Sequence, residues 1–471
     1  MSLAKDFRAE MMKIVLKNIG VLTSEVEIAP AALTIFTGGN NTGKTYAMVV
    51  LWALLAKRIS PAYTFANALL ARIQANGSVQ IPLSVFCAEY WHLIEADISN
   101  ALRKHLPTLF GAAPKFFQHS QINVALNQSA LTSLAQTLPN YGRKVAFGES
   151  GLLDMRFTMS GDDVAIAITS VSTKDIPDEL LAQAISMMIT DVVLDSYTKG
   201  AFLLPAERGG LNLVYDDLWG KGHSSRKIPD VSEHQRALMV IRHAEPIEDY
   251  VQFLKDAKLF RGLEGEFHDQ AQALQRDIAR VQFKVSEEGI VTATPDQNNG
   301  IELGIHLTSS TVKNLYGLWA WLETFAAPGA WLMIDEPELN LHPDNQRLVA
   351  RLLARLVNRG IRVVISTHSD YIVREVNNMI MLGSEFPERA AMETEFGYDA
   401  SGAERLRAED VAAWHFTDKG VDQCAISPEF GIEVQSMDDA INRLNQSNSA
   451  IYYALGEKLH PMIESSDIQT D

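Results

Sequence analysis

Gly38-Gly39-Asn40-Asn41-Thr42-Gly43-Lys44-Thr45 is the stretch that decides the fold of this 471-residue chain. It fits the pattern G-x-x-x-x-G-K-[ST] at every position. The apolar segment Ala32–Thr37 before it predicts a short strand, and the apolar run Lys44–Arg58 after it predicts a helix. The alternative is an accidental glycine-rich turn, but the flanking strand and helix are the context that the motif requires.

The residue types in this loop suit the binding of phosphate groups. Glycines let backbone N–H groups close around phosphates, and the start of a helix adds the positive end of its dipole. Lys44 would neutralise the β- and γ-phosphates, and the Thr45 hydroxyl would ligate Mg²⁺. ATP and Mg²⁺ are therefore the expected ligands. The nucleotide-binding residues predicted from this loop are Gly38, Asn40, Asn41, Thr42, Gly43, Lys44 and Thr45.

A second chemical signal is the apolar strand Leu332–Ile334, which runs directly into Asp335 and Glu336. Adjacent strand residues point to opposite sides, so the two carboxylates can take different tasks. Asp335 would hold Mg²⁺ through water, and Glu336 would polarise the attacking water. Acidic residues at strand ends are common, so the assignment of this pair to a magnesium and water site depends on the segments that follow it.

The next predicted strand, Arg362–Ser366, leads into Thr367, His368 and Ser369. A single histidine after a strand is usually a core or surface residue. Here it follows the strand next after the two carboxylates, and parallel strands would bring it to the same edge of the sheet. At that place His368 would reach the γ-phosphate.

These residues together resemble one group, the ABC-type ATPases that include RecF, the SMC proteins, the SMC-like DNA-repair ATPases and the OLD family. The segment Glu336–Pro343 (EPELNLHP) is similar to the Walker B extension and D-loop of the OLD-like and RecF-like members, whereas ABC transporters tend to have DEPTSALD-like sequences there. The resemblance is specific over residues 12–58 and 300–385. It implies a homodimer, or a higher homo-oligomer, that binds MgATP between two copies. Lys44, Glu336 and His368, the switch histidine, would be its catalytic residues.

The same resemblance implies a signature helix, which caps the ATP held by the opposite protomer. The matching segment is Leu307–Leu315, in which Ser309 and Ser310 stand at the predicted helix start. Their hydroxyls and the free N–H groups of a first helical turn would contact a γ-phosphate. Thr311 stands where relatives usually have glycine. The alternative is an ordinary Ser/Thr helix cap.

A further segment, Leu203–Leu211 (LLPAERGGL), looks like a motif of ATPases from bacterial anti-phage systems, among them the ATPase subunit of the PARIS system. The role of Glu207 and Arg208 is open from the sequence. The alternative is a plain loop that carries a surface ion pair. Softer matches to the same group lie at Asp410-Val411 and around Tyr452-Tyr453.

Alternating strands and helices imply an α/β fold. The expected form is an ABC-type P-loop ATPase core with a helix-rich insertion between the Walker A loop and the signature helix. Residues 247–283 read as a solvated amphipathic helix pair. The alternative is a short coiled-coil arm, which Gly262 and Gly265 would interrupt. The predicted segments are an N-terminal lobe (1–200), the insertion (201–299), a C-terminal lobe with signature, Walker B, D-loop and switch histidine (300–385), and a C-terminal extension (386–471).

Composition restricts the cellular location and the kinds of partner that are expected. The net charge of −17 argues against a general DNA binder, because phosphate contacts by Lys and Arg supply most non-specific affinity. It leaves room for a local basic groove or a basic protein partner. The apolar runs are too short to cross a bilayer, and Cys87 and Cys424 form no metal-ligand pattern. A reduced, cytoplasmic location is expected.

Three functions compete for this sequence. The first is a defence ATPase that senses infection and controls a separate, nuclease-like effector protein. OLD proteins carry a Toprim nuclease after the ATPase, but about 100 residues follow His368 here and contain no D-x-D pair with an upstream acidic cluster. The second is a RecF-like or SMC-like clamp that acts on DNA in repair or recombination. The third, an ABC transporter motor, fits EPELNLHP poorly.

Overall fold

The computed structural model describes residues 12–59, 64–148, 151–160, 163–171, 173, 175–213, 243–260, 262–287, 289–296, 300–434 and 443–455. Part of the helix-rich stretch predicted for residues 201–299, namely 214–242, lies outside the described residues. Among the described residues, no helix has the length and apolar character needed to span a membrane.

A six-stranded sheet forms the centre of the molecule, in the order β16-β15-β3-β14-β13-β9. The strands β15, β3, β14, β13 and β9 run parallel, and β16 pairs antiparallel with β15. The prediction of an α/β fold with a parallel sheet is confirmed. All four predicted segments of the chain contribute strands to this one sheet. The strands are β3 (Leu33–Gly38), β9 (Ala201–Leu204), β13 (Trp331–Asp335), β14 (Arg362–Thr367), β15 (Val411–Phe416) and β16 (Val421–Gln423).

These strands are apolar on both faces because both faces of the sheet are covered. Every residue of β3 and of β13 is buried, as expected for parallel strands inside an α/β protein. Successive residues of β3 alternate between two hydrophobic clusters, with Phe36 in one and Ile35 in the other. The register aligns Asp335 with Ser366 and Thr367 with Thr37, so the carboxyl ends of the strands meet at one edge.

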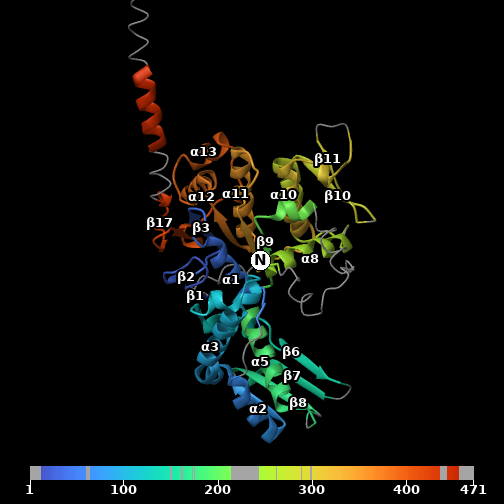
Figure 1. Cartoon of the computed structure of the whole chain (residues 1–471). Helices are drawn as coiled ribbons and strands as arrows, with labels where there is room; N and C mark the ends of the chain where they lie inside the picture. The colour runs from blue at the N-terminus through green and yellow to red at the C-terminus, as the bar shows by residue number, and fades with distance from the viewer. Residues whose placement is uncertain are drawn as a thin grey trace, which may run out of the picture.

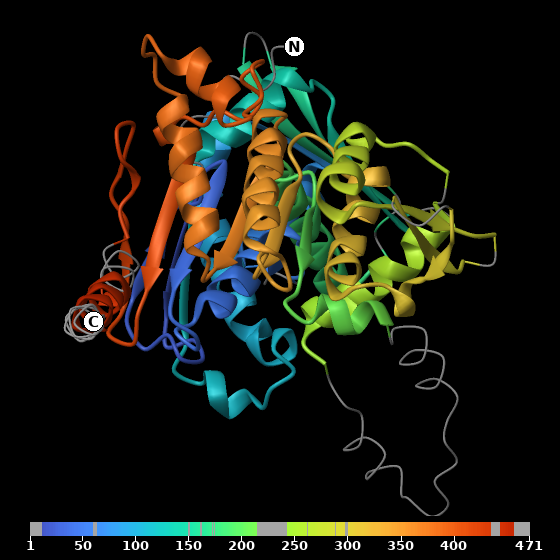
Figure 2. The ribbon, with the colours of Figure 1, turned by 90° about the horizontal axis from the view of Figure 1, so that it is seen from above.

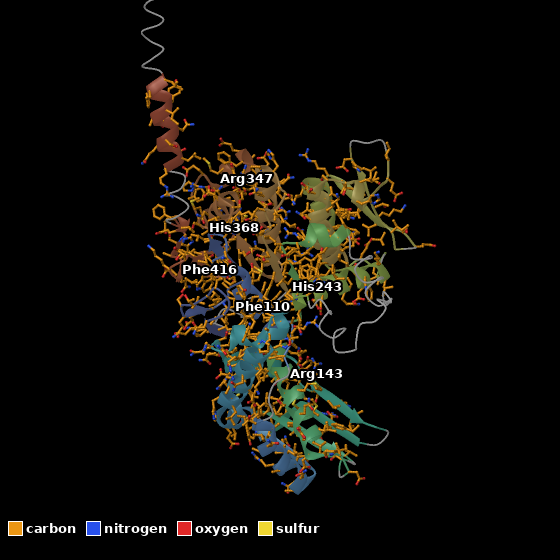
Figure 3. The ribbon with its side chains drawn as sticks, in the orientation of Figure 1. Phe110, Arg143, His243, Arg347, His368 and Phe416 are labelled. Atoms are coloured by element: carbon orange, nitrogen blue, oxygen red, sulfur yellow. The ribbon has the colours of Figure 1, made fainter. Side chains whose placement is uncertain are left out.

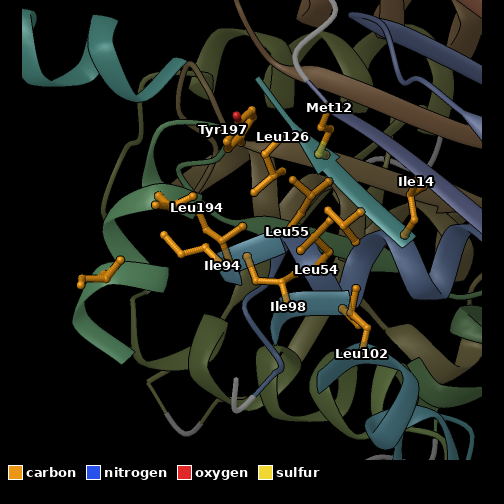
Figure 4. Packing of buried hydrophobic residues seen from close by; sticks show 14 of the residues in the cluster. Met12, Ile14, Leu54, Leu55, Ile94, Ile98, Leu102, Leu126, Leu194 and Tyr197 are labelled. Carbon is orange, nitrogen blue, oxygen red and sulfur yellow. The ribbon is translucent and has the colours of Figure 1, made fainter. Parts of the chain in front are cut away.

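The first hydrophobic cluster covers one face with helices and a small antiparallel sheet. Figure 4 shows Met12 and Ile14 of β1 in the same cluster as Leu54, Ile98 and Tyr197. The elements are α1 (Lys44–Leu55), α3 (Leu83–Leu109), α5 (Asp178–Asp195), and the sheet of β2 (Val26–Ile28), β1 (Met12–Lys17) and β5 (Gln121–Leu126).

Helix α1 ends earlier than the predicted Arg58. Lys57 has a left-handed φ of 56°, the N–H of Arg58 donates to the carbonyl of Ala53 (2.8 Å), and the N–H of Lys57 donates to the carbonyl of Leu54 (3.2 Å). This pair of hydrogen bonds is a Schellman motif, which closes a helix and satisfies its last carbonyls. The apolar run continues past the helix end, so its length alone overestimates the helix.

An antiparallel sheet in the order β4-β8-β7-β6 lies at the far end of the molecule from α11 and α12 (Figure 1). Its strands are β4 (Ser78–Pro82), β6 (Gly142–Phe147), β7 (Gly151–Ser160) and β8 (Asp163–Val171), and the neighbouring helices include α2 (Thr64–Asn76) and α4 (Gln128–Thr137). The short helix η1 (Pro114–Phe117) packs against α3.

The second hydrophobic cluster covers the other face of the central sheet, where α11 and α12 lie along the strands (Figure 2). A small sheet in the order β10-β11-β12 stands beside α10 (Figure 1). The helices are α8 (Glu245–Leu259), α9 (His268–Ala273), η2 (Leu274–Ala279), η3 (Ile305–Leu307), α10 (Ser310–Thr324), α11 (Pro343–Asn358) and α12 (Asp370–Leu382), and the strands are β10 (Val281–Val285), β11 (Val291–Pro295) and β12 (Leu303–Gly304).

Residues 247–283 contain the predicted helix pair, α8 and the shorter α9, which continues as a π-helical turn. Both helices pack against the body, and the stretch differs from the prediction at its end, where the left-handed Arg280 (φ 53°) turns the chain into strand β10. Gly265 approaches α10 so closely that an added Cβ would lie 2.8 Å from the carbonyl oxygen of Thr324. The glycine therefore serves this close packing, and the described residues of the stretch form no coiled-coil arm.

The C-terminal part returns to the central sheet through β15 and β16 and then leaves it. Its remaining elements are α13 (Arg389–Glu395), η4 (Ala408–Asp410), β17 (Ile426–Ser427) and β18 (Gly431–Ile432). Residues 443–455 form a helix that points away from the body, and all of them are exposed (Figure 1).

Candidate nucleotide-binding site

The predicted phosphate-binding loop connects β3 to α1 at the carboxyl edge of the central sheet. Gly38 has a φ of 130°, and an added Cβ there would lie 1.9 Å from the carbonyl oxygen of Phe416. Gly43, at the N-cap of α1, has a φ of 103° and no side chain hydrogen-bonded over the helix start. The glycines are thus required by close approach and by left-handed backbone. The uncapped first turn of α1 leaves its N–H groups to an anion.

Lys44 folds back over this loop. Its Nζ donates hydrogen bonds to the carbonyl oxygens of Gly38 (3.2 Å) and Gly39 (2.6 Å), and the residue is buried. Burial lowers the pKa of Lys44, while the nearby carboxylates of Asp335, Glu336 and Glu338 oppose that shift. The ammonium group therefore lies between the loop and the acidic end of β13, where a phosphate would enter.

Thr45 and Asp335, the two predicted magnesium ligands, are in direct contact. The Thr45 hydroxyl donates to Oδ2 of Asp335 over 2.8 Å, and the Ser366 hydroxyl donates to Oδ1 of the same carboxylate. A hydroxyl and a carboxylate oxygen side by side are the hard oxygen donors that Mg²⁺ accepts alongside water and phosphate. These residues fit the ion that the sequence implies.

Glu336 follows the end of β13 with a left-handed backbone (φ 52°), so it leaves the strand instead of alternating with Asp335 as expected for a regular strand. One carboxylate oxygen lies 3.8 Å from Nε2 of His368. Burial is the main cause that raises the pKa of Glu336; Asp335 and Glu338 add to it, and His368 and Lys44 oppose it. A raised pKa brings a carboxylate closer to the range of an efficient general base.

Glu338 has a structural role that was not predicted from the sequence. Its carboxylate accepts hydrogen bonds from the Thr367 hydroxyl (2.9 Å) and from the backbone N–H of His368 (2.6 Å). These bonds fix the loop after β14 against the loop after β13 and so hold His368 near Glu336. Figure 3 shows His368 in the half of the molecule opposite to Arg143. The signal was present in EPELNLHP, since its second glutamate comes two residues after Glu336.

Ser309 and Ser310 lie at the start of α10, as predicted. The Ser309 hydroxyl accepts a hydrogen bond from the N–H of Val312 (3.3 Å), so this serine is a helix cap as the alternative interpretation holds. Among the described residues, no hydrogen bond or ion pair joins either serine to the phosphate-binding loop. Thr311 instead contacts the D-loop, because its hydroxyl donates to the carbonyl of Asn340 (2.7 Å).

The buried position of Arg208 contradicts the alternative interpretation of Leu203–Leu211 as a plain loop with a surface ion pair. It is 3% exposed and contacts three main-chain carbonyls, those of Pro205 (3.0 Å), Asp335 (2.7 Å) and Glu336 (2.7 Å). Burial lowers the pKa of its guanidinium. Glu207 beside it is exposed.

The structure brings the predicted residues Lys44, Thr45, Asp335, Glu336 and His368 together at one edge of the sheet. The family model described as "AAA domain, putative AbiEii toxin, Type IV TA system" matches residues 211–374, well under half of the chain. The matched span contains α10, Asp335, Glu336 and His368 and begins after the phosphate-binding loop. No curated protein matches this chain.

Solved structures of SMC head domains also match. One is an Smc head bound to the C-winged helix domain of ScpA (11% identity, TM-score 0.36, covering 89% of this chain and 98% of that chain). A second has an extended coiled coil and is bound to the C-terminal domain of ScpA derived from Pyrococcus furiosus (12% identity, TM-score 0.36, covering 93% and 98%). A third is the SMC head domain from Thermotoga maritima (10% identity, TM-score 0.29, covering 89% and 100%).

The phosphate-binding loop lies at the end of one parallel strand, and the paired carboxylates lie at the end of another, two places away in the sheet. The matched AAA domain covers the second of these features. Together they identify a mixed α/β fold with a parallel sheet, in which the phosphate-binding loop and the span matched by the AAA-domain model meet at one edge.

Proposed function

We propose that this protein binds MgATP at the Lys44–Thr45 loop and hydrolyses it to ADP and phosphate. The observation that carries the proposal is the 2.8 Å contact between Thr45 and Asp335, with Lys44 and Glu336 at the same edge. Bound Mg²⁺ would neutralise charge on the β- and γ-phosphates. In the same site, Lys44 would exchange its two loop carbonyls for phosphate oxygens.

The hydrolytic step falls to Glu336 and His368. Glu336 would accept the proton of the attacking water as that water bonds to the γ-phosphorus and the bond to the β-phosphate oxygen breaks. His368, held near Glu336 through Glu338, would donate to a γ-phosphate oxygen. Most of the catalysis would then come from positioning and charge, as is usual for phosphoryl transfer.

We further propose a homodimer in which α10 of one copy faces the loop of the other. The D-loop and α10 are joined within the chain by the hydrogen bonds from Thr311 to Asn340 and from Asn314 to Leu339 (2.9 Å). Leu307, just before the helix start, is 65% exposed, and an apolar side chain there is suited to burial against a second copy. Nucleotide bound at one loop would thereby be sensed by the neighbouring chain.

For the biological role we propose the ATPase component of a defence system that controls a separate effector. The matched family description names a toxin of a type IV toxin–antitoxin system, which supports a role of this kind. The net charge of −17 favours a basic protein partner over general DNA binding.

Steady-state hydrolysis of ATP by the purified full chain, measured as phosphate release with and without Mg²⁺, tests the enzymatic proposal. We expect slow, Mg²⁺-dependent turnover that Glu336→Gln lowers by a factor on the order of 100 or more. Absence of turnover in the presence of tight ATP binding would leave a nucleotide-dependent binding protein and would overturn the hydrolytic assignment.

A further inference from the structure

Arg208 is a buried cation whose hydrogen bonds go to main-chain carbonyls. It follows β9, the edge strand next to β13, and residues 208–213 are helical (Figure 1). Its guanidinium donates to the carbonyls of Asp335 and Glu336, at 2.7 Å each. Taking a charge out of water costs stability unless strong partners replace the water. A buried arginine at this position is therefore expected to have a role, and that role concerns the two carbonyls to which it donates.

The two carbonyls belong to the two peptide planes on either side of the Glu336 Cα atom. In the first plane, the Asp335 oxygen accepts from Arg208, and the Glu336 N–H donates to the carbonyl of Ser366 (3.0 Å). In the second plane, the Glu336 oxygen accepts from the other arm of the same guanidinium (2.7 Å) and, over a longer distance, from the N–H of Leu339 (3.1 Å). Residue 337 is a proline and has no N–H, so this carbonyl is the hydrogen-bonding group of the second plane.

Fixing both planes fixes φ and ψ of Glu336. Its φ of 52° lies in the left-handed region, which non-glycine residues adopt only when the surroundings impose it. In a regular extended conformation, the Glu336 side chain would leave its place near His368. A planar guanidinium with two parallel donors can hold two carbonyls at once, whereas a lysine ammonium is a point charge on a flexible stem.

We propose that Arg208 is a positioning residue: it holds Glu336 in the left-handed conformation that aims its carboxylate at the attacking water. This inference rests on the proposed hydrolysis of ATP by the same site. It adds a role for a buried residue that donates to main-chain carbonyls and acts through the backbone of Glu336.

The segment that carries Arg208 is itself fixed to α10. The Asn212 side chain donates to the carbonyl of Lys313 (2.5 Å) and accepts from the Tyr250 hydroxyl (2.8 Å). Gly209 faces Asn314 so closely that an added Cβ would lie 2.1 Å from Oδ1 of that buried side chain. A displacement of α10 would therefore move Arg208 and, through it, Glu336.

The test compares Arg208→Lys with Arg351→Lys in the full chain. Arg351 is a matched control, because it is also buried and also donates to two main-chain carbonyls, those of Gly397 (2.6 Å) and Phe396 (3.3 Å).

Steady-state ATP hydrolysis gives kcat and KM, binding of a non-hydrolysable ATP analogue gives Kd, and thermal unfolding reports the fold. We expect Arg208→Lys to lower kcat by roughly 10- to 100-fold with KM and Kd within about 3-fold, since misplacement of a catalytic group affects the chemical step. Arg351→Lys should leave kcat within about 2-fold.

A second arm asks whether Arg208 acts through Glu336. In the Glu336→Gln background, measured by single-turnover hydrolysis of radiolabelled ATP, Arg208→Lys should cause no further loss, because residues that act as one unit are not additive. If Arg208→Lys does not fold, Gly209→Ala replaces it. Its Cβ would push the segment off Asn314 with Arg208 intact, and the same fall in kcat is expected.

A wild-type kcat in the folded Arg208→Lys or Gly209→Ala protein would overturn the inference, as would a full additional loss in the Glu336→Gln background. In either case hydrolysis by the wild type and its loss in Glu336→Gln would leave the proposed function standing. If the wild type itself does not hydrolyse ATP, the proposed function fails, and the inference fails with it.

Discussion

The hydroxyl of Thr45 and a carboxylate oxygen of Asp335 lie 2.8 Å apart, although 290 residues separate them in the chain. The contact joins the first turn of α1 to the end of β13 across the intervening strand β14, whose Ser366 hydroxyl holds the other oxygen of the same carboxylate. One helix and two strands thus contribute to one small polar site. Its chemistry depends on the order of strands in the sheet as much as on the motifs themselves.

Glu336→Gln should separate binding of ATP from its hydrolysis. The amide keeps the size and hydrogen-bonding reach of the side chain but accepts no proton, so we expect turnover to fall on the order of 100-fold or more. Binding of a fluorescent ATP analogue should stay near the wild-type value. Turnover at the wild-type rate would show that another group activates the water.

Lys44→Ala is the complementary change. It removes the ammonium group that lies between the loop carbonyls and the carboxylates of β13. Because a charge-assisted contact to phosphate is lost, we expect ATP affinity to weaken at least about 10-fold, and the weakening should be seen by titration at fixed Mg²⁺. Thr42→Ala, which removes a hydroxyl hydrogen-bonded within the loop to Gly39, serves as a milder control. Unchanged affinity in Lys44→Ala would argue against this loop as the phosphate site.

A site shared between two copies predicts complementation. Protomers with Lys44→Ala and protomers with Ser309→Arg should each be inactive alone, because every homodimer site then contains one defect. Mixed in equal amounts, they should recover about a quarter of the wild-type activity, since half of the dimers are mixed and each has one intact site. Ser309→Ala removes the cap without adding bulk or charge and should retain most activity. Lack of recovery at every mixing ratio would contradict the shared site.

The sequence predicted the α/β class, the strands around the phosphate-binding loop and the five polar residues that meet at the sheet edge. It did so because the motif residues carry their own context, a strand before and a helix after. Local signals indicated that β13 and β14 share a sheet, but they did not add β9 and β15 to it or give the order of its strands, since strand order depends on packing between distant segments. They also left the role of Arg208 open and did not single out Glu338. Arg208 is recognisable only once β9 lies beside β13, and Glu338 only once the two loops meet.

The ends of helices and strands could also not be predicted from the pattern of apolar residues. Helix α1 stops at Leu55 although apolar residues and good helix formers continue. The left-handed conformation of Lys57 ends the helix. This conformation is rarer for lysine than for glycine, so the residue type does not predict the helix end. The turn at Arg280, which starts β10 inside a predicted helix, has the same cause.

The pair of Glu393 and Arg405 should contribute to stability in a pH-dependent way. Glu393 is 2% exposed and accepts two hydrogen bonds from the guanidinium (2.6 and 2.8 Å), and these lower its pKa. Arg405→Ala leaves the carboxylate buried and should cost about 2 kcal/mol in urea unfolding at neutral pH. Arg407→Ala, at a more exposed ion pair, should cost about 0.5 kcal/mol or less.

The sign of the pH effect follows from the lowered pKa of Glu393. Its contribution is fully present above the unfolded pKa of about 4.3 and is lost as the pH falls through the lower folded value. The difference in unfolding free energy between wild type and Arg405→Ala should therefore be constant from neutral pH to about pH 5 and then shrink. A difference that grows on acidification would contradict this account of the pair.

The last prediction is that the biological output is delivered by another protein. Candidate docking surfaces are residues 205–290 and the last 100 or so residues, since the proposed dimer would occupy the nucleotide edge. Within the second, the helix of residues 443–455 exposes Leu444, Ile451, Tyr452 and Tyr453, each by more than half of its surface. An isolated helix of this length is marginal in water, and apolar side chains exposed along it are suited to burial against a partner.

Purified alone, the chain should hydrolyse ATP slowly and leave plasmid and linear DNA uncut with Mg²⁺ or Mn²⁺. Co-expressed with the protein encoded beside it in its operon, it should form a complex whose amount changes with ATP or with Glu336→Gln, because a partner with different affinity for the two dimer states is retained or released accordingly. Ile451→Ser combined with Tyr452→Ser should weaken that complex at least about 10-fold. Phe116→Ser, at an exposed aromatic residue outside both candidate surfaces, should not. Robust DNA cleavage by the isolated chain would overturn the prediction and would make the protein a nuclease in its own right.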